Sequence, residues 1–221
     1  KVTAPANDSP EALFNKVTTF VPVFSAINSD GTWGYGQNGD NPIASAKASG
    51  VSTTTTPELA IKGFLSLTPL EGLEIYTNYS QNRLENKADQ FLKPYDTYET
   101  GVYKVTYPTT GNDKSESWGQ TIINQFNLQA SYEKNLGSHY FKVLGGMQTE
   151  ELLGRSFAAG RKFFKYAGFE DLNNGDVLSA TNSGSHYEWA MLSYYGRFNY
   201  NYLERYLIEV NRRIVASTRL K

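Results

Sequence analysis

Three β-hairpins with alternating apolar and polar side chains constrain this chain more than any other feature. The sequence predicts hairpins at residues 59–79, 121–148 and 191–216. Within each strand, side chains of one parity are mostly apolar and those of the other are mostly polar, as Leu128 between Asn127 and Gln129 illustrates. Because successive side chains of a strand point to opposite faces, this pattern indicates strands with one apolar and one wet face. We therefore expect an all-β, antiparallel structure.

The hairpin turns are short, whereas the segments that join one hairpin to the next are long. The predicted turns lie at 68–72, 133–138 and 202–205. Strands of roughly 9–11 residues with short turns at one end and long loops at the other are typical of outer-membrane β-barrels. Six such strands cannot close a large barrel. We therefore expect an antiparallel transmembrane β-barrel segment, with long extracellular loops, that forms part of a larger wall.

Composition fits a barrel and also fits a soluble sheet. Hydrophobic residues make up 39% of the chain and mean hydropathy is −0.49. Alternation by itself favours a soluble sheet with one buried face, where tyrosine is also common. Strand length, the asymmetry of turns and loops, and tyrosines beside the turns favour the membrane, where such rings form an interfacial girdle. Those tyrosines are Tyr132, Tyr140, Tyr200, Tyr202 and Tyr206.

The alternation assigns each strand face a role. Residues expected to line a wet lumen are Asn127, Gln129, Ser131, Arg197, Asn199, Glu209 and Asn211. Residues expected to face lipid are Phe126, Leu128, Phe141, Val143, Leu192, Phe198, Ile208 and Val210.

Residues 1–57 are rich in Ser, Thr, Gly, Asn and Ala, and we expect them to form mostly an extracellular loop. One short helix is predicted at Ser9–Val17. Ser9 suits the N-cap and Pro10 suits the first helical position.

Sequence motifs for catalysis, metal binding or nucleic acid binding are weak. Cysteine is absent, only two histidines occur, and the net charge is −1 without a basic stripe. The segment Gly34–Gly39 has the letters of a dinucleotide fingerprint but lacks the preceding strand and following helix. We assign no catalytic residue, no metal, no cofactor and no nucleic acid partner.

The two long segments 83–118 and 154–189 concentrate aromatic side chains. Such rings either stack on sugars or peptides or pack the loops together, and the sequence leaves both readings open. The ligand-contacting candidates are Tyr95, Tyr98, Tyr103, Trp118, Phe163, Phe164 and Tyr166.

The third hairpin carries a family resemblance. Ser193–Tyr202 reads SYYGRFNYNY and Arg205–Arg213 reads RYLIEVNRR, which resembles a mid-barrel hairpin of SusC/RagA TonB-dependent outer-membrane transporters. Asp30-Gly31, Asn41–Ala44 and the turn Leu70–Leu73 agree in order. The family pattern then continues with Tyr-Asp, where this chain has Ile214 and Val215.

The resemblance implies a 22-stranded barrel in the bacterial outer membrane with an N-terminal plug that lies outside this chain. It also implies a SusD-like surface lipoprotein as lid, import of an oligosaccharide or peptide, and energy from the TonB complex through other parts of the protein. On that basis the aromatic loops contact substrate or lid. The alternative is a secreted β-sandwich that binds glycans.

Overall fold

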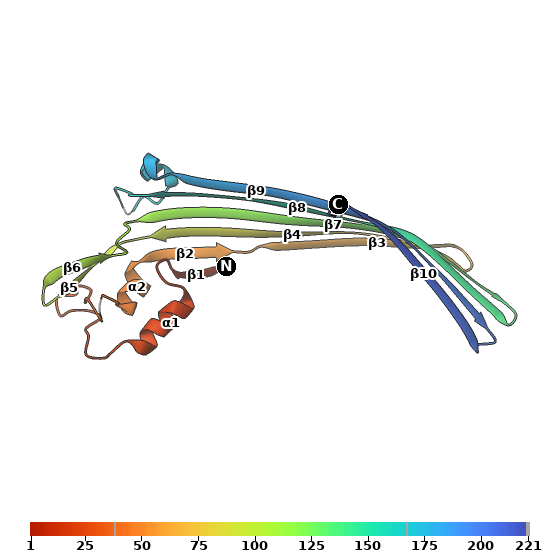
Figure 1. Ribbon diagram of the computed structural model, residues 1–221, viewed down its shortest axis with the longest axis horizontal. Coiled ribbons are helices and arrows are strands. Elements are labelled where there is room, and N and C mark those ends of the chain that lie inside the picture. Colours follow the sequence, from red (N-terminus) through yellow and green to blue (C-terminus); the bar gives the residue numbers. More distant parts are fainter. Residues whose placement is uncertain (38, 167, 220–221) are drawn as a thin grey trace. The chain divides into compact units, whose positions relative to one another are not determined.

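The computed structural model describes residues 1–37, 39–166 and 168–219, most of which lie in antiparallel β-sheet (Figure 1). Two compact units make up the chain. The sheet unit comprises Pro57–Glu85, Gln120–Arg155 and Ser185–Lys221. The lobe unit comprises Lys1–Thr56, Asn86–Gly119 and Ser156–Gly184.

Long strands contribute most of both units. They are β3 (Glu58–Leu70), β4 (Leu73–Leu92), β7 (Asp113–Leu136), β8 (His139–Lys162), β9 (Thr181–Tyr202) and β10 (Tyr206–Ser217). The remaining elements are β1 (Val2–Pro5), α1 (Pro10–Thr19), α2 (Pro42–Ala48), β2 (Gly50–Thr55), β5 (Tyr95–Glu99), β6 (Val102–Tyr107) and the 3₁₀ turns η1 (Leu172–Asn174) and η2 (Val177–Ser179). None of the helices in the described part of the chain is long and apolar enough to cross a membrane.

In the sheet unit the strands follow the order β3-β4-β7-β8-β9-β10. The three short turns lie at one end of this sheet, as the topology of consecutive hairpins requires (Figure 1). Hydrogen bonds join neighbouring turns: Glu133 N donates to Gly72 O at 2.8 Å, and Leu203 N donates to Ser138 O at 2.9 Å. The prediction that all three turns share one end is confirmed.

The strand register sorts side chains as the alternation predicts. In the β9–β10 pair Phe198 lies opposite Val210, and Arg197 lies opposite Asn211. Directly opposed residues of an antiparallel pair share a face. The apolar and polar positions therefore form separate rows on opposite faces.

The sheet unit has no hydrophobic core of its own. The buried apolar side chains among the described residues are Ala44, Phe91, Tyr95 and Phe164, and all four belong to the lobe unit. In the sheet unit large apolar side chains stay exposed, among them Leu65, Val143 and Ile208. A single exposed sheet with an apolar face needs lipid or further protein against it, because water disfavours so much apolar surface.

The strands reach well beyond the predicted hairpins. β4 runs to Leu92, β7 begins at Asp113 and β9 begins at Thr181, so much of 83–118 and 154–189 is strand rather than loop. Along residues 86–90 of β4, polar side chains occupy both faces of the strand. An alternation of apolar and polar residues cannot detect such strands.

Residues 1–57 are more ordered than a loop, since they contain β1, α1, α2 and β2. α1 begins where predicted: the Ser9 hydroxyl accepts a hydrogen bond from Ala12 N at 3.1 Å, and Pro10 opens the helix. α2 begins in the same way, with Asn41 as its N-cap. The sequence analysis did not predict α2, because its segment lacks apolar periodicity, although Asn41 and Pro42 repeat the capping pattern of α1.

Candidate functional site

One face of the sheet unit carries a connected row of polar side chains on β9 and β10. The Arg197 Nε donates to Asn211 Oδ1 at 2.9 Å, and the Asn211 amide donates to Glu209 Oε1 at 2.5 Å. Asn199 Nδ2 donates to the other Glu209 oxygen at 2.6 Å. Glu209 accepts both bonds, which fixes a carboxylate on an exposed polar surface.

The same face continues over β7 through Tyr195. The Tyr195 hydroxyl lies 2.7 Å from Asn127 Oδ1 and 3.2 Å from Gln129 Oε1. The structure thus brings six of the seven residues predicted to line a lumen, all except Ser131, onto one hydrogen-bonded polar face. Whether that face borders a lumen stays a prediction.

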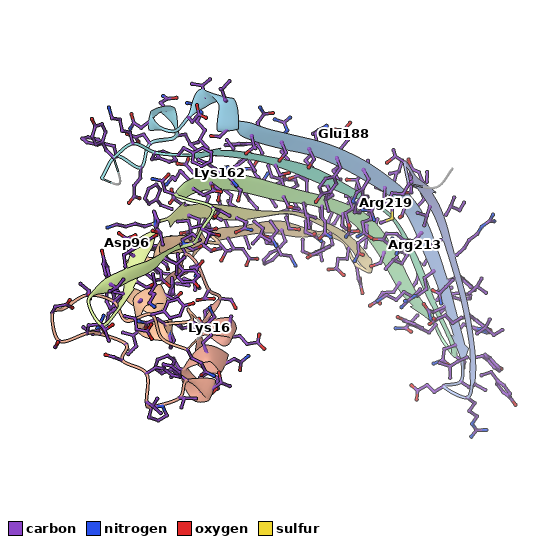
Figure 2. The ribbon with its side chains drawn as sticks, turned by 60° about the vertical axis from the view of Figure 1, so that its left-hand side comes forward. Lys16, Asp96, Lys162, Glu188, Arg213 and Arg219 are labelled. Atoms are coloured by element: carbon purple, nitrogen blue, oxygen red, sulfur yellow. The ribbon has the colours of Figure 1, made fainter. Side chains whose placement is uncertain are left out.

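Sequence reasoning missed two members of this face. Arg213 donates to Gln148 Oε1 at 3.2 Å and to Ser193 Oγ at 3.0 Å, which links β10 to β8 and β9 (Figure 2). Tyr195 was missed as well. Both share parity with Arg197 along their hairpin register, and that parity is the signal that could have identified them.

The opposite face is apolar and exposed. The predicted lipid-facing side chains Leu128, Val143, Phe198, Ile208 and Val210 are between 38% and 58% accessible. An apolar face of this extent on a single-layer sheet is the surface a bilayer would cover.

The seven aromatic candidates fall into three groups. Tyr95 and Phe164 are buried, and the Phe164 ring meets Phe91 edge-on at 5.4 Å, so these two rings pack the lobe unit. Trp118 lies in β7 rather than in a loop, with its ring 5.8 Å from that of Phe157. The remaining four are available to a ligand to different degrees: Tyr103, Phe163 and Tyr166 are 54–61% exposed, and Tyr98 is half-buried.

The β5–β6 hairpin presents Tyr98 and Tyr103 on a fixed backbone. Tyr98 N donates to Trp33 O at 2.8 Å, and Tyr35 N donates to Tyr98 O at 2.9 Å. The Tyr98 and Tyr103 rings meet edge to face at 6.1 Å. A ring pair held by backbone bonds loses little freedom when a ligand binds.

Asp96 completes the polar side of this hairpin (Figure 2). The Thr106 hydroxyl donates to Asp96 Oδ1 at 2.5 Å, and the Tyr103 hydroxyl lies 3.0 Å from Thr106 Oγ1. The surface therefore combines exposed rings with a carboxylate and hydroxyls. Such a combination suits sugars and peptides equally.

Charged groups pin α1 to the rest of the lobe unit. Lys16 Nζ lies 3.0 Å from Asp8 Oδ1 and 3.1 Å from Asp40 Oδ1. Burial by itself would lower the pKa of Lys16, but its hydrogen bonds to the two carboxylates outweigh burial and raise that pKa. For the nearby Tyr95 phenol, burial acts in the opposite direction and raises the pKa to about 12, because it disfavours the charged phenolate.

Lys114 is a second feature that the sequence did not single out. Its side chain is almost fully buried, and Nζ lies 2.7 and 2.8 Å from the two Asp89 oxygens. Glu116 adds a longer contact at 3.5 Å. The ion pair between Lys114 and Asp89 joins β7 to β4, so we assign it a structural role. Across the described residues no group of three or more His, Cys, Asp or Glu side chains is placed to hold a metal ion.

Comparison with known proteins identifies proteins of similar sequence and fold. No protein-family model matches the sequence. The chain is 24% identical over 202 residues to TonB-dependent receptor P3 of Formosa agariphila, covering 88% of this chain and 19% of that protein. It also superposes on the RagAB peptide transporter with a TM-score of 0.68 and 21% identity, covering 77% of this chain and 18% of that one.

Two further RagAB structures, in closed-closed and open-open states, match with TM-scores of 0.68 and 0.67. The chain spans about a fifth of the length of these relatives. They are receptors and transporters, not enzymes, and their shared fold confirms an antiparallel sheet like a portion of a TonB-dependent transporter.

Proposed function

We propose that this chain forms part of the barrel wall and outer loops of a TonB-dependent outer-membrane transporter of the SusC/RagA type, which imports a peptide or glycan. The observation that carries the proposal is the sheet unit: a single layer without buried apolar side chains, with one hydrogen-bonded polar face and one exposed apolar face. Lipid on the apolar side and water in a lumen on the polar side satisfy both faces.

The proposal orients the molecule. The three short turns face the periplasm, and the long connections between the hairpins face the outside of the cell, as in other outer-membrane barrels. Asn127, Gln129, Arg197, Asn199 and Glu209 line the lumen. The plug and the contact to TonB lie in other parts of the protein.

The partner in this proposal is a SusD-like surface lipoprotein that closes over the lobe unit. Support comes from the likeness to RagAB, whose structures show closed-closed and open-open states. The exposed rings of Tyr103, Phe163 and Tyr166 are the side chains we assign to substrate or lid contact. Burial of Tyr95 and Phe164 leaves them a packing role.

A secreted β-sandwich fits the structure less well. A sandwich requires two sheets packed face to face around a shared core. In the described parts of the chain the second sheet is only the hairpin of β5 and β6. The sheet unit has no buried apolar side chain that such packing would produce.

The test uses the full-length protein that contains this chain, in its native host. We expect it in the outer-membrane fraction, with uptake of defined peptides or oligosaccharides that stops when the gene is deleted or the proton gradient is collapsed. Recovery of the protein as a soluble secreted species, or uptake that is unchanged by deletion, would contradict the proposal.

A further inference from the structure

A polar cavity opens on the lobe unit, in a place that none of the sequence motifs indicated. Its volume is 430 Å³, within the range of small-molecule sites. Four neighbouring strands contribute side chains, with Gln90 from β4, Ser115 from β7, Gly160 from β8 and Thr181 from β9. Asn182 and Ser183 extend the same wall.

A glycine keeps the floor of this cavity open. A Cβ atom at Gly160 would lie 3.0 Å from Thr181 Oγ1 and 3.8 Å from the Cβ of Ser115. Glycine inside a strand often marks a position where a ligand or another chain approaches the backbone closely. Ala158 adds a second small side chain to the same strand.

The uncharged hydrogen-bonding groups of the wall are in part unused, and Arg161, Lys162 and Asp113 add charged groups to the lining. Gln90 donates its amide to Ala6 O at 2.7 Å, which leaves the amide oxygen as an acceptor. The side chains of Ser115, Asn182 and Ser183 have no hydrogen-bond partner among the described residues. Hydroxyl and amide groups both donate and accept, which matches the alternating groups of a peptide main chain.

One ion pair flanks the cavity, and it is loose. Lys162 Nζ lies 3.5 Å from Asp113 Oδ2, and both side chains are more than a third exposed (Figure 2). A charge-assisted hydrogen bond usually spans about 2.7–2.9 Å, as the Lys114–Asp89 contact at 2.7 Å does. Exposed ion pairs contribute little to stability. Lys162 and Asp113 can therefore separate, and each can bind an oppositely charged group of a ligand instead.

The cavity lacks the aromatic platform that sugar rings stack on: in the described structure its lining residues include no aromatic side chain.

We propose that this cavity binds a short peptide with free termini, whose carboxylate contacts Lys162, whose ammonium contacts Asp113 and whose main chain bonds to the Ser, Thr, Asn and Gln side chains. The inference rests on the proposed transport function and narrows its substrate to zwitterionic peptides.

The experiment measures binding to the purified full-length protein. The probe is an equimolar mixture of defined tripeptides, offered either with free termini or acetylated and amidated, and retained peptide is quantified by mass spectrometry. We expect at least tenfold tighter binding of the free form. Asp113→Asn and Lys162→Gln should each lose about tenfold for the free form and leave the capped form unchanged.

Two further variants sharpen the result. Gly160→Val should abolish binding of both forms by filling the floor. Lys104→Gln, which breaks the ion pair to Glu99 on the β5–β6 hairpin, is the matched control and should bind as wild type. The two charge variants alter an exposed pair only, so they remain informative if the glycine variant fails to fold.

Equal binding of free and capped peptides, unchanged binding in both charge variants, or preferential binding of maltotriose would overturn the inference. Each of these outcomes leaves the proposed function standing if the protein still imports its nutrient from the outer membrane. Loss of outer-membrane localisation in the wild type would instead refute the proposed function.

Discussion

Asn41 makes three hydrogen bonds from one almost fully buried side chain. Its Oδ1 accepts from Ala44 N at 3.0 Å as the cap of α2, and its Nδ2 donates to Ala26 O at 2.7 Å and Gly34 O at 2.8 Å. Replacement by Ala removes the cap and the donor to Gly34 O, whereas Ala26 O still accepts a hydrogen bond from Gly34 N. We expect Asn41→Ala to lower local stability by roughly 2–4 kcal/mol.

Hydrogen exchange of amides in residues 26–45 measures this loss. Asn15→Ala, on the exposed side of α1, is the matched control and should leave exchange unchanged. Equal protection in the two variants would show that the Asn41 contacts contribute nothing.

Tyr95 gives the lobe unit a predictable response to alkali. Its folded pKa of about 12 exceeds the unfolded value near 10 because burial disfavours the phenolate, with Asp8 and Asp40 adding to the effect and Lys16 opposing it. A raised folded pKa means that the stabilising contribution is complete below pH 10 and is lost as pH rises toward 12. The full loss is roughly 2–3 kcal/mol.

The difference between wild type and Tyr95→Phe isolates this effect, because the two proteins differ only in the Tyr95 hydroxyl. Hydrogen exchange of the lobe unit should rise more steeply between pH 10 and 12 in wild type than in the variant. Parallel curves would mean that Tyr95 ionises as readily in the folded as in the unfolded protein.

The turn between β9 and β10 carries backbone strain. Leu203 and Glu204 have φ of 53° and 56°, a left-handed conformation that costs a side-chain-bearing residue about 1–2 kcal/mol. Positive φ at two successive positions is typical of a type I′ turn, in which Asn-Gly is the preferred pair. We expect Leu203→Asn with Glu204→Gly to stabilise the full-length barrel against urea by about 1–2 kcal/mol.

Gly137, in the neighbouring turn between β7 and β8, provides a control substitution for which the opposite effect on stability is expected. Its φ is +63° and a Cβ would meet nothing within 4 Å, so Gly137→Ala adds backbone strain without a clash. Unfolding in liposomes should show the two changes with opposite signs. A destabilised Asn-Gly variant would indicate that the Leu203 side chain contributes contacts worth more than the strain.

The alternation of apolar and polar side chains along β7 yields a prediction for substitutions on its two faces. Leu128 belongs to the apolar face, whereas Asn127 on the polar face accepts a hydrogen bond from Tyr195. Leu128→Arg should cost about 2–4 kcal/mol near the bilayer midplane. Asn127→Arg should cost about 1 kcal/mol, the worth of one hydrogen bond. Equal penalties in liposome unfolding would argue against a lipid-facing row.

The alternation was sufficient to predict the elements of the sheet unit and failed in the lobe unit for a physical reason. Where one face meets apolar surroundings, as at Leu128 and Val210, side-chain type reports the face. Where polar side chains occupy both faces, as along residues 86–90, side-chain type does not report the face, and the strand ends were missed. The cavity beside Gly160 was not predicted for the same reason, since four strands contribute ordinary polar side chains to its lining.

At the scale of the whole molecule, each unit's stability needs a different explanation. The lobe unit is held by a small core around Phe91 and Phe164, by the Lys16 ion pairs and by capped helices. The sheet unit lacks any comparable core, so its apolar face depends on surroundings outside this chain. If the sheet unit lies in a bilayer as proposed, the lipid fixes which of its residues must be apolar, whereas the lobe unit's internal contacts leave its exposed side chains free to vary.

The exposed rings of the lobe unit should therefore affect transport and not assembly. We expect the triple variant Tyr103→Ser, Phe163→Ser, Tyr166→Ser to insert normally, because these rings are more than half exposed and contribute little to packing. Its nutrient uptake or its co-purification with a surface lipoprotein should fall at least tenfold, since flat rings supply contact area at low entropic cost. Tyr206→Ser, an equally exposed tyrosine beside a short turn, should retain both activities. Wild-type uptake and wild-type lipoprotein recovery in the triple variant would show that these rings are not the working surface.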